Sequence, residues 1–157
     1  MTEQSHIFMS PVGELFLKQQ NGCLVSVDMN TKTCATESEQ GKIDNKIIKQ
    51  LQEYFDGQRT QFSLPIKLMG TEFQRKVWQE MQKIPHGETC SYSDIAKKIN
   101  SSPRAVGNAC RANPIPVIVP CHRVVAKSGM GGYCGQTSGK YMDTKHWLLK
   151  HEGVVTQ

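Results

Sequence analysis

The tripeptide Cys121-His122-Arg123 places a nucleophile, a base and a positive charge next to one another. A cysteine attacks as its thiolate, and a nearby base or cation favours that form. Residues 113–120 form an apolar run with three prolines, which predicts an extended strand that holds the thiol in a fixed, water-poor position. Adjacent side chains on a strand point to opposite faces, so contact between Cys121 and His122 would need a turn or an intervening water.

Two other interpretations of this segment remain open at this point. A buried cysteine is often an inert packing residue. It can also be a zinc ligand, but no further Cys or His lies at ligand spacing from Cys121, and the other cysteines are scattered. The tripeptide alone does not decide between these roles.

A carboxylate near the C-terminus, Glu152, is the candidate partner of His122. The pattern predicts a helix that starts at Asp143 or Thr144 and is stopped by Gly153, so Glu152 lies in its last turn. The helix dipole disfavours a carboxylate there by roughly 0.3–1 kcal/mol. A site that needs the charge to orient a histidine would accept this cost, and loss of the charge should then not weaken the fold. The alternative is an exposed glutamate without a function.

Three helices are predicted between residue 71 and the tripeptide. A capping box at residues 71–74 starts the first, which carries an apolar stripe and ends at Pro85. The second starts at residues 91–94, and Ser102-Pro103 provides an N-cap and a first-turn proline for the third, which runs to about Ala112. A short connector gives the last two the form of a helix-turn-helix.

The third of these helices is slim and basic on its predicted outer face. Its small residues are Ala105, Gly107, Asn108, Ala109 and Ala112, and its long ones are Arg104 and Arg111. Small side chains let a helix approach a surface closely, and arginines bind phosphates or stack on bases. The pattern therefore favours contact with nucleic acid, although a plain buried helix with Val106 and Cys110 on its inner face is the alternative.

The N-terminal half has a different pattern. Short apolar runs, interrupted by a turn at residues 10–13 and by the hairpin signal Asn21-Gly22, predict strands, and one helix that Gly57 ends follows a polar loop. The chain is therefore expected to hold a small α/β domain, residues 1–66, and a mainly helical domain, residues 67–157.

Charge separates the two halves as well. Residues 1–65 hold six Lys/Arg and eight Asp/Glu, a net −2, whereas residues 66–157 hold thirteen and six, a net +7. A basic half suggests a polyanionic partner, although an ordinary solvated surface would look similar. No run of about 18 apolar residues and no signal peptide is present, so we expect a cytoplasmic protein, with no membrane partner, whose six cysteines are thiols.

Taken together, these segments resemble the O6-alkylguanine-DNA alkyltransferases. The resemblance rests on Ile-Val-Pro-Cys-His-Arg-Val-Val at residues 118–125, Pro-Arg-Ala-Val-Gly at 103–107, Trp-Leu-Leu-Lys-His-Glu-Gly at 147–153 and Ser-Pro-Val-Gly-Glu-Leu at 10–15. It implies a ribonuclease-H-like N-terminal domain and a winged-helix C-terminal domain. It also implies DNA repair by direct, single-use transfer of an alkyl group from O6 of guanine, or O4 of thymine, to a cysteine.

The same resemblance assigns roles to individual residues. Cys121 would accept the alkyl group, His122 would activate it through a bound water, and Glu152 would hold His122. Asn113 would brace the turn before the active-site segment, and Tyr92 would donate toward the purine ring. The expected DNA- and base-binding residues are Arg104, which would fill the stack after the base flips out, and Ala105, Gly107, Asn108, Arg111, Arg123, Val124, Tyr133 and Cys134.

Two departures from the family concern the rim of the base pocket. The segment from Tyr133 to Trp147 is longer than usual, and Cys134 stands where a Ser, Ala or similar residue is typical. No cofactor is expected. No metal is expected either, because Cys23, Cys34 and His6 do not match the zinc site of some family members. The expected partner is double-stranded DNA with an alkylated guanine, bound by a monomer without an obligate protein partner.

Three other function classes compete with repair. A protein that senses alkylated bases without repairing them would lack the cysteine, which this chain has. A cysteine hydrolase using Cys121 and His122 would turn over many times. A transcription factor using the helix-turn-helix would leave the Cys-His-Arg segment without a purpose.

Overall fold

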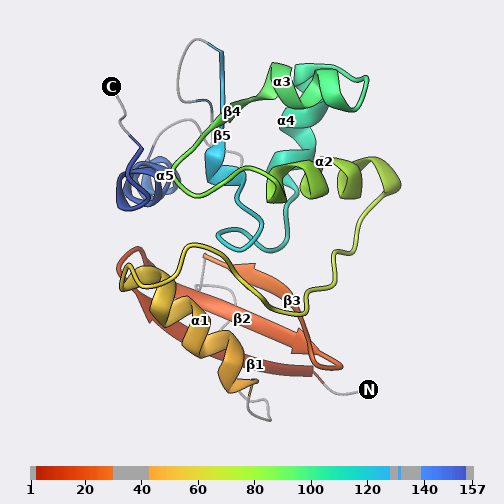
Figure 1. The fold of residues 1–157 in the computed structure, drawn as a ribbon. Helices are drawn as coiled ribbons and strands as arrows, with labels where there is room; N and C mark the ends of the chain where they lie inside the picture. Colours follow the sequence, from red (N-terminus) through yellow and green to blue (C-terminus); the bar gives the residue numbers. More distant parts are fainter. Residues whose placement is uncertain (1–2, 30–42, 128–130, 132–138, 155–157) are drawn as a thin grey trace. The chain divides into compact units, whose positions relative to one another are not determined.

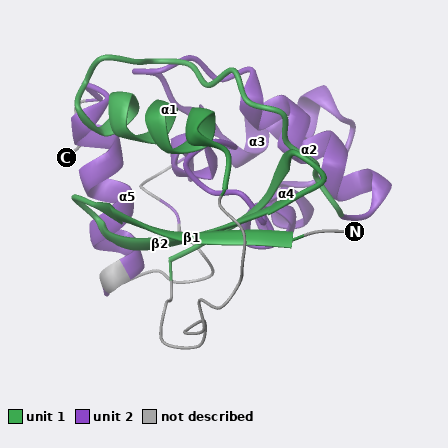
Figure 2. Cartoon of the chain, turned by 90° about the horizontal axis from the view of Figure 1, so that it is seen from below, with its two compact units in different colours: residues 1–69 green, residues 70–157 purple. Residues whose placement is uncertain are grey.

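The computed structural model describes residues 3–29, 43–127, 131 and 139–154. The chain divides into two compact units, residues 1–69 and residues 70–157, which Figure 2 colours separately. Within the described residues, no helix is long and apolar enough to cross a membrane.

The first unit is a three-stranded antiparallel sheet with one helix over it (Figure 1). Its strands are β1 (Glu3–Ser10), β2 (Gly13–Gln20) and β3 (Cys23–Asp28), in the order β1-β2-β3, and its helix is α1 (Asn45–Phe55). Asn21 and Gly22 both have positive φ, 51° and 81°, which is the conformation that an Asn-Gly hairpin turn requires. The hairpin predicted there is confirmed.

The core of the first unit lies between the sheet and α1. Leu15, Leu17 and Leu24 from the strands and Leu51 and Tyr54 from the helix are buried. Asp44 caps α1 by accepting a hydrogen bond from the amide of Lys46 at 3.1 Å. Removal of these apolar side chains from water is the main force that keeps the helix on the sheet.

The second unit is mainly helical. Its elements are α2 (Glu72–Gln82), β4 (Cys90–Ser91), α3 (Tyr92–Lys98), α4 (Pro103–Arg111), the 3-10 turn η2 (Cys121–Arg123), β5 (Val124–Val125) and α5 (Lys140–His151). The predicted capping box at Thr71 and Gln74 is present, and Ser91 and Ser102 cap α3 and α4 as expected. The helix-turn-helix formed by α3 and α4 is thereby confirmed.

Two long-range contacts join the elements of the second unit. The indole Nε1 of buried Trp78 on α2 donates to the carbonyl of Ala109 on α4 at 2.8 Å. The short strands β4 and β5 pair in parallel, with Cys90 opposite Val124 and Ser91 opposite Val125. Since β5 directly follows η2, this pairing ties the Cys-His-Arg turn to the segment that starts α3.

The segment before Cys121 differs from the expected strand. Residues 114–119 form bends and turns, the amide of Val119 donates to the carbonyl of Ile115 at 2.9 Å, and Val117 has a φ of 76°. The three prolines cannot donate to a strand ladder, so a loop that buries Ile115, Val117 and Val119 satisfies this sequence better.

The last helix also differs from its predicted start. It begins at Lys140, ahead of Asp143 and Thr144, and the amide of Asp143 already donates to the carbonyl of Gly139 at 3.0 Å. Met142 is buried, so the apolar face extends one turn further back than the Asp-Thr cap pattern suggests.

Candidate active site

Cys121 opens the 3-10 turn η2 and is buried. Burial raises the pKa of its thiol to about 11, while a hydrogen bond from the Asn113 side chain and the charge of Lys145 act to lower it. At neutral pH the thiol is therefore protonated. It needs a base at the moment of reaction, because only the thiolate is a strong nucleophile.

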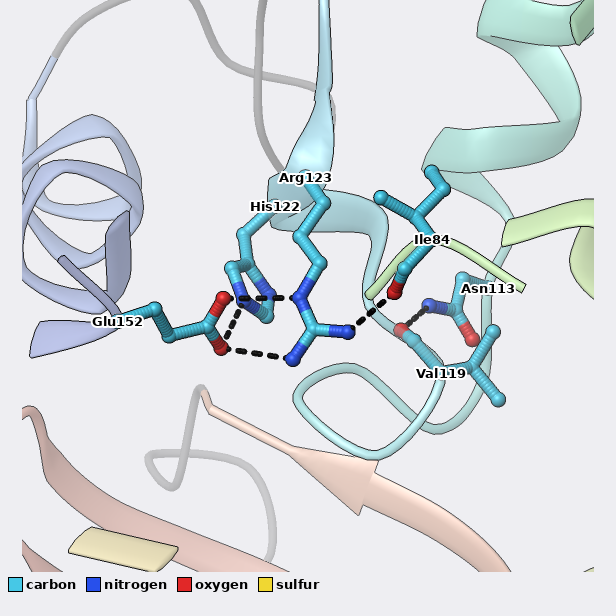
Figure 3. A network of polar contacts seen from close by, with 6 residues as sticks. All are labelled: Ile84, Asn113, Val119, His122, Arg123 and Glu152. Carbon is cyan, nitrogen blue, oxygen red and sulfur yellow. Dashed lines mark hydrogen bonds and ion pairs between the residues drawn. The ribbon is translucent and has the colours of Figure 1, made fainter. Parts of the chain in front are cut away.

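Asn113 closes the loop that precedes Cys121, and its bond to Val119 is drawn in Figure 3. Its Nδ2 donates to the carbonyl of Val119 at 2.8 Å, and its Oδ1 accepts from the amide of Ile115 at 2.9 Å. One side chain thus bridges the two ends of a loop in which the prolines remove backbone donors. This arrangement fits the bracing role that the resemblance implies for Asn113.

The 3-10 turn also changes the geometry expected for the tripeptide. Successive side chains rotate by about 120° in a 3-10 helix, so Cys121 and His122 are not held on opposite faces as they would be on a strand. Both side chains remain buried. The turn that the sequence argument required for their cooperation is present.

His122, Arg123 and Glu152 form a buried network, drawn in Figure 3. His122 Nε2 lies 2.8 Å from Glu152 Oε2. Arg123 donates from Nε to Glu152 Oε1 at 2.8 Å and from Nη2 to Oε2 at 3.0 Å. Glu152 is the C-cap residue of α5 and is only 4% exposed, so it is not the exposed glutamate of the alternative interpretation.

The network determines which nitrogen of His122 acts as a base. An ionised carboxylate only accepts hydrogen bonds, so we assign the proton to Nε2. Burial lowers the pKa of His122, against the raising effect of Glu152, and the charges of Arg123 and Lys145 lower it further. Nδ1 is buried and has no hydrogen-bond partner among the described residues. His122 is therefore neutral and offers Nδ1 as a proton acceptor.

Lys145 is a charged residue of the site that the sequence argument missed. It is fully buried on α5, and its Nζ donates to the carbonyl of Val124 at 2.8 Å. Burial lowers its pKa to about 8, while Cys121 and Cys110 act to raise it. Its position could have signalled this role, because Met142, Leu148 and Leu149 lie at helical spacing from it on the apolar face.

The expected DNA-binding residues of α4 lie mostly on its accessible side. Arg104, Asn108 and Arg111 are exposed, and Ala105 and Gly107 are half-buried. Ala109 is buried and belongs to the inner face with Val106 and Cys110, which corrects its predicted place among the outer small residues. Tyr92 is half-buried beside α4, because a Cβ added to Gly107 would lie 4.0 Å from its ring.

Arg123 is placed differently from its predicted role at the DNA surface. Within the described residues, its hydrogen bonds go to Glu152 and to the carbonyl of Ile84, and its side chain is 8% exposed. An arginine committed to a buried carboxylate cannot also reach a phosphate, so we withdraw it as a DNA contact. Val124 is fully buried in β5. Tyr133 and Cys134 lie outside the described residues.

Comparison with known proteins agrees with this geometry. Residues 72–154 match the DNA-binding domain of 6-O-methylguanine DNA methyltransferase, and residues 5–68 match its ribonuclease-like domain. The chain belongs to this family. The predicted family and the fold class, a ribonuclease-like α/β domain followed by a mainly α DNA-binding domain, are confirmed.

Individual relatives span nearly the whole chain. A methylated-DNA–protein-cysteine methyltransferase of Metallosphaera sedula is 40% identical, covering 94% of this chain and 92% of that protein. A constitutive protein of that name from Bacillus subtilis is 38% identical over 92% of both chains. The crystal structure of Mycobacterium tuberculosis O6-methylguanine methyltransferase has a TM-score of 0.84 and 34% identity, covering 96% of this chain and 93% of that one.

A further solved relative was captured with nucleic acid. The Mycobacterium tuberculosis protein in complex with DNA has a TM-score of 0.80 and 36% identity, and the match covers 96% of this chain and 92% of that chain.

Among the described residues of the present chain, no group of three or more His, Cys, Asp or Glu side chains is arranged to hold a metal ion.

Proposed function

We propose that Cys121 takes a methyl or other alkyl group from O6 of guanine in double-stranded DNA and keeps it as a thioether. The observation that carries the assignment is the bare, buried Nδ1 of His122, since its Nε2 is held by Glu152 at 2.8 Å. The membership of the chain in the methyltransferase family supports the reaction class. Alkylated thymine is a second substrate that the same chemistry would allow.

The transfer is an in-line displacement at carbon. The Cys121 thiol gives its proton to His122 Nδ1, through a bound water, and the thiolate then attacks the alkyl carbon. The bond from that carbon to O6 breaks as the sulfur–carbon bond forms, and the guanine leaves with the bonding electrons. The Tyr92 hydroxyl donates toward the purine ring, which stabilises the leaving base as charge develops on it.

The product explains why the protein is used only once. Water does not displace the thiolate from the alkyl carbon of a thioether under mild conditions, so the alkylated Cys121 is not regenerated. No step of this scheme calls for a cofactor, because the thiol, the histidine base and the leaving base supply every proton and electron pair.

Binding of the target base involves the helix-turn-helix. The exposed side of α4 carries Arg111 for the phosphates, and its small residues let the helix lie close to the duplex. Arg104 fills the stack from which the base is flipped, a movement that costs a few kcal/mol. The DNA complex of the Mycobacterium tuberculosis relative supports DNA as the partner. We propose that the protein acts as a monomer in the cytosol.

An intact-mass measurement tests the proposal. Incubation with duplex DNA that contains methylated guanine should add the mass of one methyl group, once per molecule, and peptide mapping should locate it on Cys121. The Cys110→Ser variant serves as the control, since Cys110 is also buried and contacts Met81 Sδ at 3.5 Å. Methylation of another cysteine would contradict the assignment. Repeated turnover would favour the hydrolase, and binding without transfer would favour the sensor.

A further inference from the structure

The buried side chain of Arg123 has no place in the reaction scheme above, yet it donates three hydrogen bonds. Its Nε and Nη2 bind the two oxygens of Glu152, at 2.8 and 3.0 Å, and its Nη1 donates to the carbonyl of Ile84 at 2.6 Å. In Figure 3 the guanidinium lies between that carboxylate and that carbonyl. A planar donor held at three points fixes the plane of the carboxylate that it binds.

The fixed carboxylate determines the state of His122. Glu152 Oε2 accepts from both Arg123 Nη2 and His122 Nε2, so the imidazole cannot turn without losing its bond. The positive charge of Arg123 also keeps Glu152 ionised in the interior, because an unpaired buried carboxylate would take up a proton. A protonated carboxylic acid could donate to His122 and thereby permit the opposite tautomer.

We propose that Arg123 is a positioning residue for alkyl transfer. It holds Glu152 as an ionised, oriented acceptor, and so keeps His122 neutral with its proton on Nε2 and Nδ1 bare for the Cys121 proton. This inference rests on the proposed function, since it concerns activation of the same thiol. It explains why an arginine follows the Cys-His pair although it does not reach the surface.

Three charged groups shift the pKa of His122, so the proposal predicts how the pH dependence of transfer changes when Arg123 is replaced. Glu152 raises the pKa of His122, whereas Arg123 and Lys145 lower it. Without Arg123, the Glu152–His122 pair keeps an extra proton to higher pH, and a protonated Nδ1 cannot accept one from the thiol. A merely structural Arg123, tying Ile84 to the end of α5, would change stability but would leave the pH dependence of transfer unaltered.

The first test is the pH profile of single-turnover methyl transfer. Arg123→Met should slow transfer roughly 10²-fold near neutral pH, as expected for a misplaced catalytic group, and should move the acid limb of the profile to higher pH. Arg123→Lys keeps the charge but loses the two hydrogen bonds that Nε and Nη2 donate to Glu152. It should therefore react more slowly but retain an acid limb near that of the wild type. Arg59→Met is the matched control, because it breaks a partly exposed pair with Glu53 in the first unit.

A second test does not depend on activity. Nitrogen-15 NMR of His122 in the unmodified protein should show the proton on Nε2 and no proton on Nδ1. In Arg123→Met, Nδ1 should become protonated. In Arg123→Lys, the spectrum should show a mixture of the two neutral tautomers. If Arg123→Met does not fold, Arg123→Lys provides both measurements.

The outcomes separate the two proposals. Wild-type rate and tautomer in Arg123→Lys, or a uniform loss of rate in Arg123→Met with an unmoved acid limb, would overturn the role of Arg123. A wild-type protein that shows the Nε2 tautomer and its dependence on Arg123, but never accepts a methyl group, would leave that role standing and overturn the proposed function.

Discussion

The ammonium group of Lys145 donates to the main-chain carbonyl of Val124 at 2.8 Å inside the second unit, where both residues are fully buried. The bond ties α5 to β5, directly after the reactive turn. A buried lysine keeps its charge only at a cost, because its pKa falls to about 8 from the usual 10.5. As long as Lys145 is protonated, its positive charge acts to lower the pKa of Cys121 and so favours the thiolate.

This cost predicts a pH dependence of stability. Between pH 8 and 10.5 the unfolded chain binds a proton at Lys145 that the folded chain has lost, so the contribution of this residue to stability rises with pH across that window. The buried thiols have raised pKa values and act in the opposite direction, so the comparison must be with Lys145→Met. Relative to this variant, the wild type should gain about 3 kcal/mol by pH 10.5. Urea titrations at several pH values measure the difference, and a constant gap would show that burial does not lower the pKa of Lys145 in the folded protein.

A second prediction concerns the carboxylate of Glu152. Glu152→Gln removes the charge that holds both Arg123 and His122, so transfer should slow by roughly 10²-fold or more, as for loss of general base support. It should also destabilise the fold by about 3–5 kcal/mol, because it leaves the buried charge of Arg123 unpaired. A thermal melt and single-turnover transfer on the same sample measure both effects. A variant with wild-type rate would make Glu152 a bystander.

That stability estimate reverses the one drawn from the sequence. Helical periodicity placed Glu152 at the end of the last helix, where the dipole alone suggested that the charge weakens the fold. The sequence does not reveal that Arg123, 29 positions away, donates to both carboxylate oxygens. An unpaired Arg123 in the interior costs about 3–5 kcal/mol, which outweighs a dipole term of roughly 0.3–1 kcal/mol, so the long-range contact decides the sign.

Turns and helix caps could be predicted from the sequence because they depend on neighbouring residues alone. The Asn21-Gly22 turn and the caps at Thr71, Ser91 and Ser102 could all be predicted, because each depends on residues within one turn of the chain. The loop before Cys121 could not. Its apolar composition is typical of a strand, although the prolines cannot donate the hydrogen bonds of a sheet. The loop is instead stabilised by the burial of Val117 and its neighbours, a tertiary contact that the local sequence does not reveal.

A third prediction separates DNA handling from chemistry. Arg104 is exposed on α4, so Arg104→Ala should leave stability within about 0.5 kcal/mol of the wild type. If the side chain fills the vacated stack, transfer from duplex DNA should fall far more than transfer from free methylated guanine base, which need not be flipped. Single-turnover rates on the two substrates give the comparison, with Arg59→Ala as the control. Equal losses on both substrates would place Arg104 in the pocket or the fold instead.

The last prediction uses the close approach of Gly131 to Tyr92. Gly131 has a φ of 72°, and a Cβ there would lie 2.8 Å from Tyr92 Cε2, 3.0 Å from its hydroxyl oxygen and 3.2 Å from the amide nitrogen of Ala126. The backbone at Ala126 cannot yield as easily as a side chain, so Gly131→Ala should push the Tyr92 ring aside. We therefore expect slower transfer, because the proposed hydroxyl donor leaves its position.

A double-mutant cycle with Tyr92→Phe tests whether Gly131 acts through that hydroxyl. If it does, Gly131→Ala should cost much less rate in the Tyr92→Phe background than in the wild type, since the donor is already gone. Gly57→Ala controls for backbone strain, because Gly57 has a φ of 79° with open space around the added Cβ. Both alanine variants should lose about 1–2 kcal/mol of stability from the left-handed conformation. Additive losses of rate would mean that Gly131 serves the local backbone and that the position of Tyr92 does not limit the reaction.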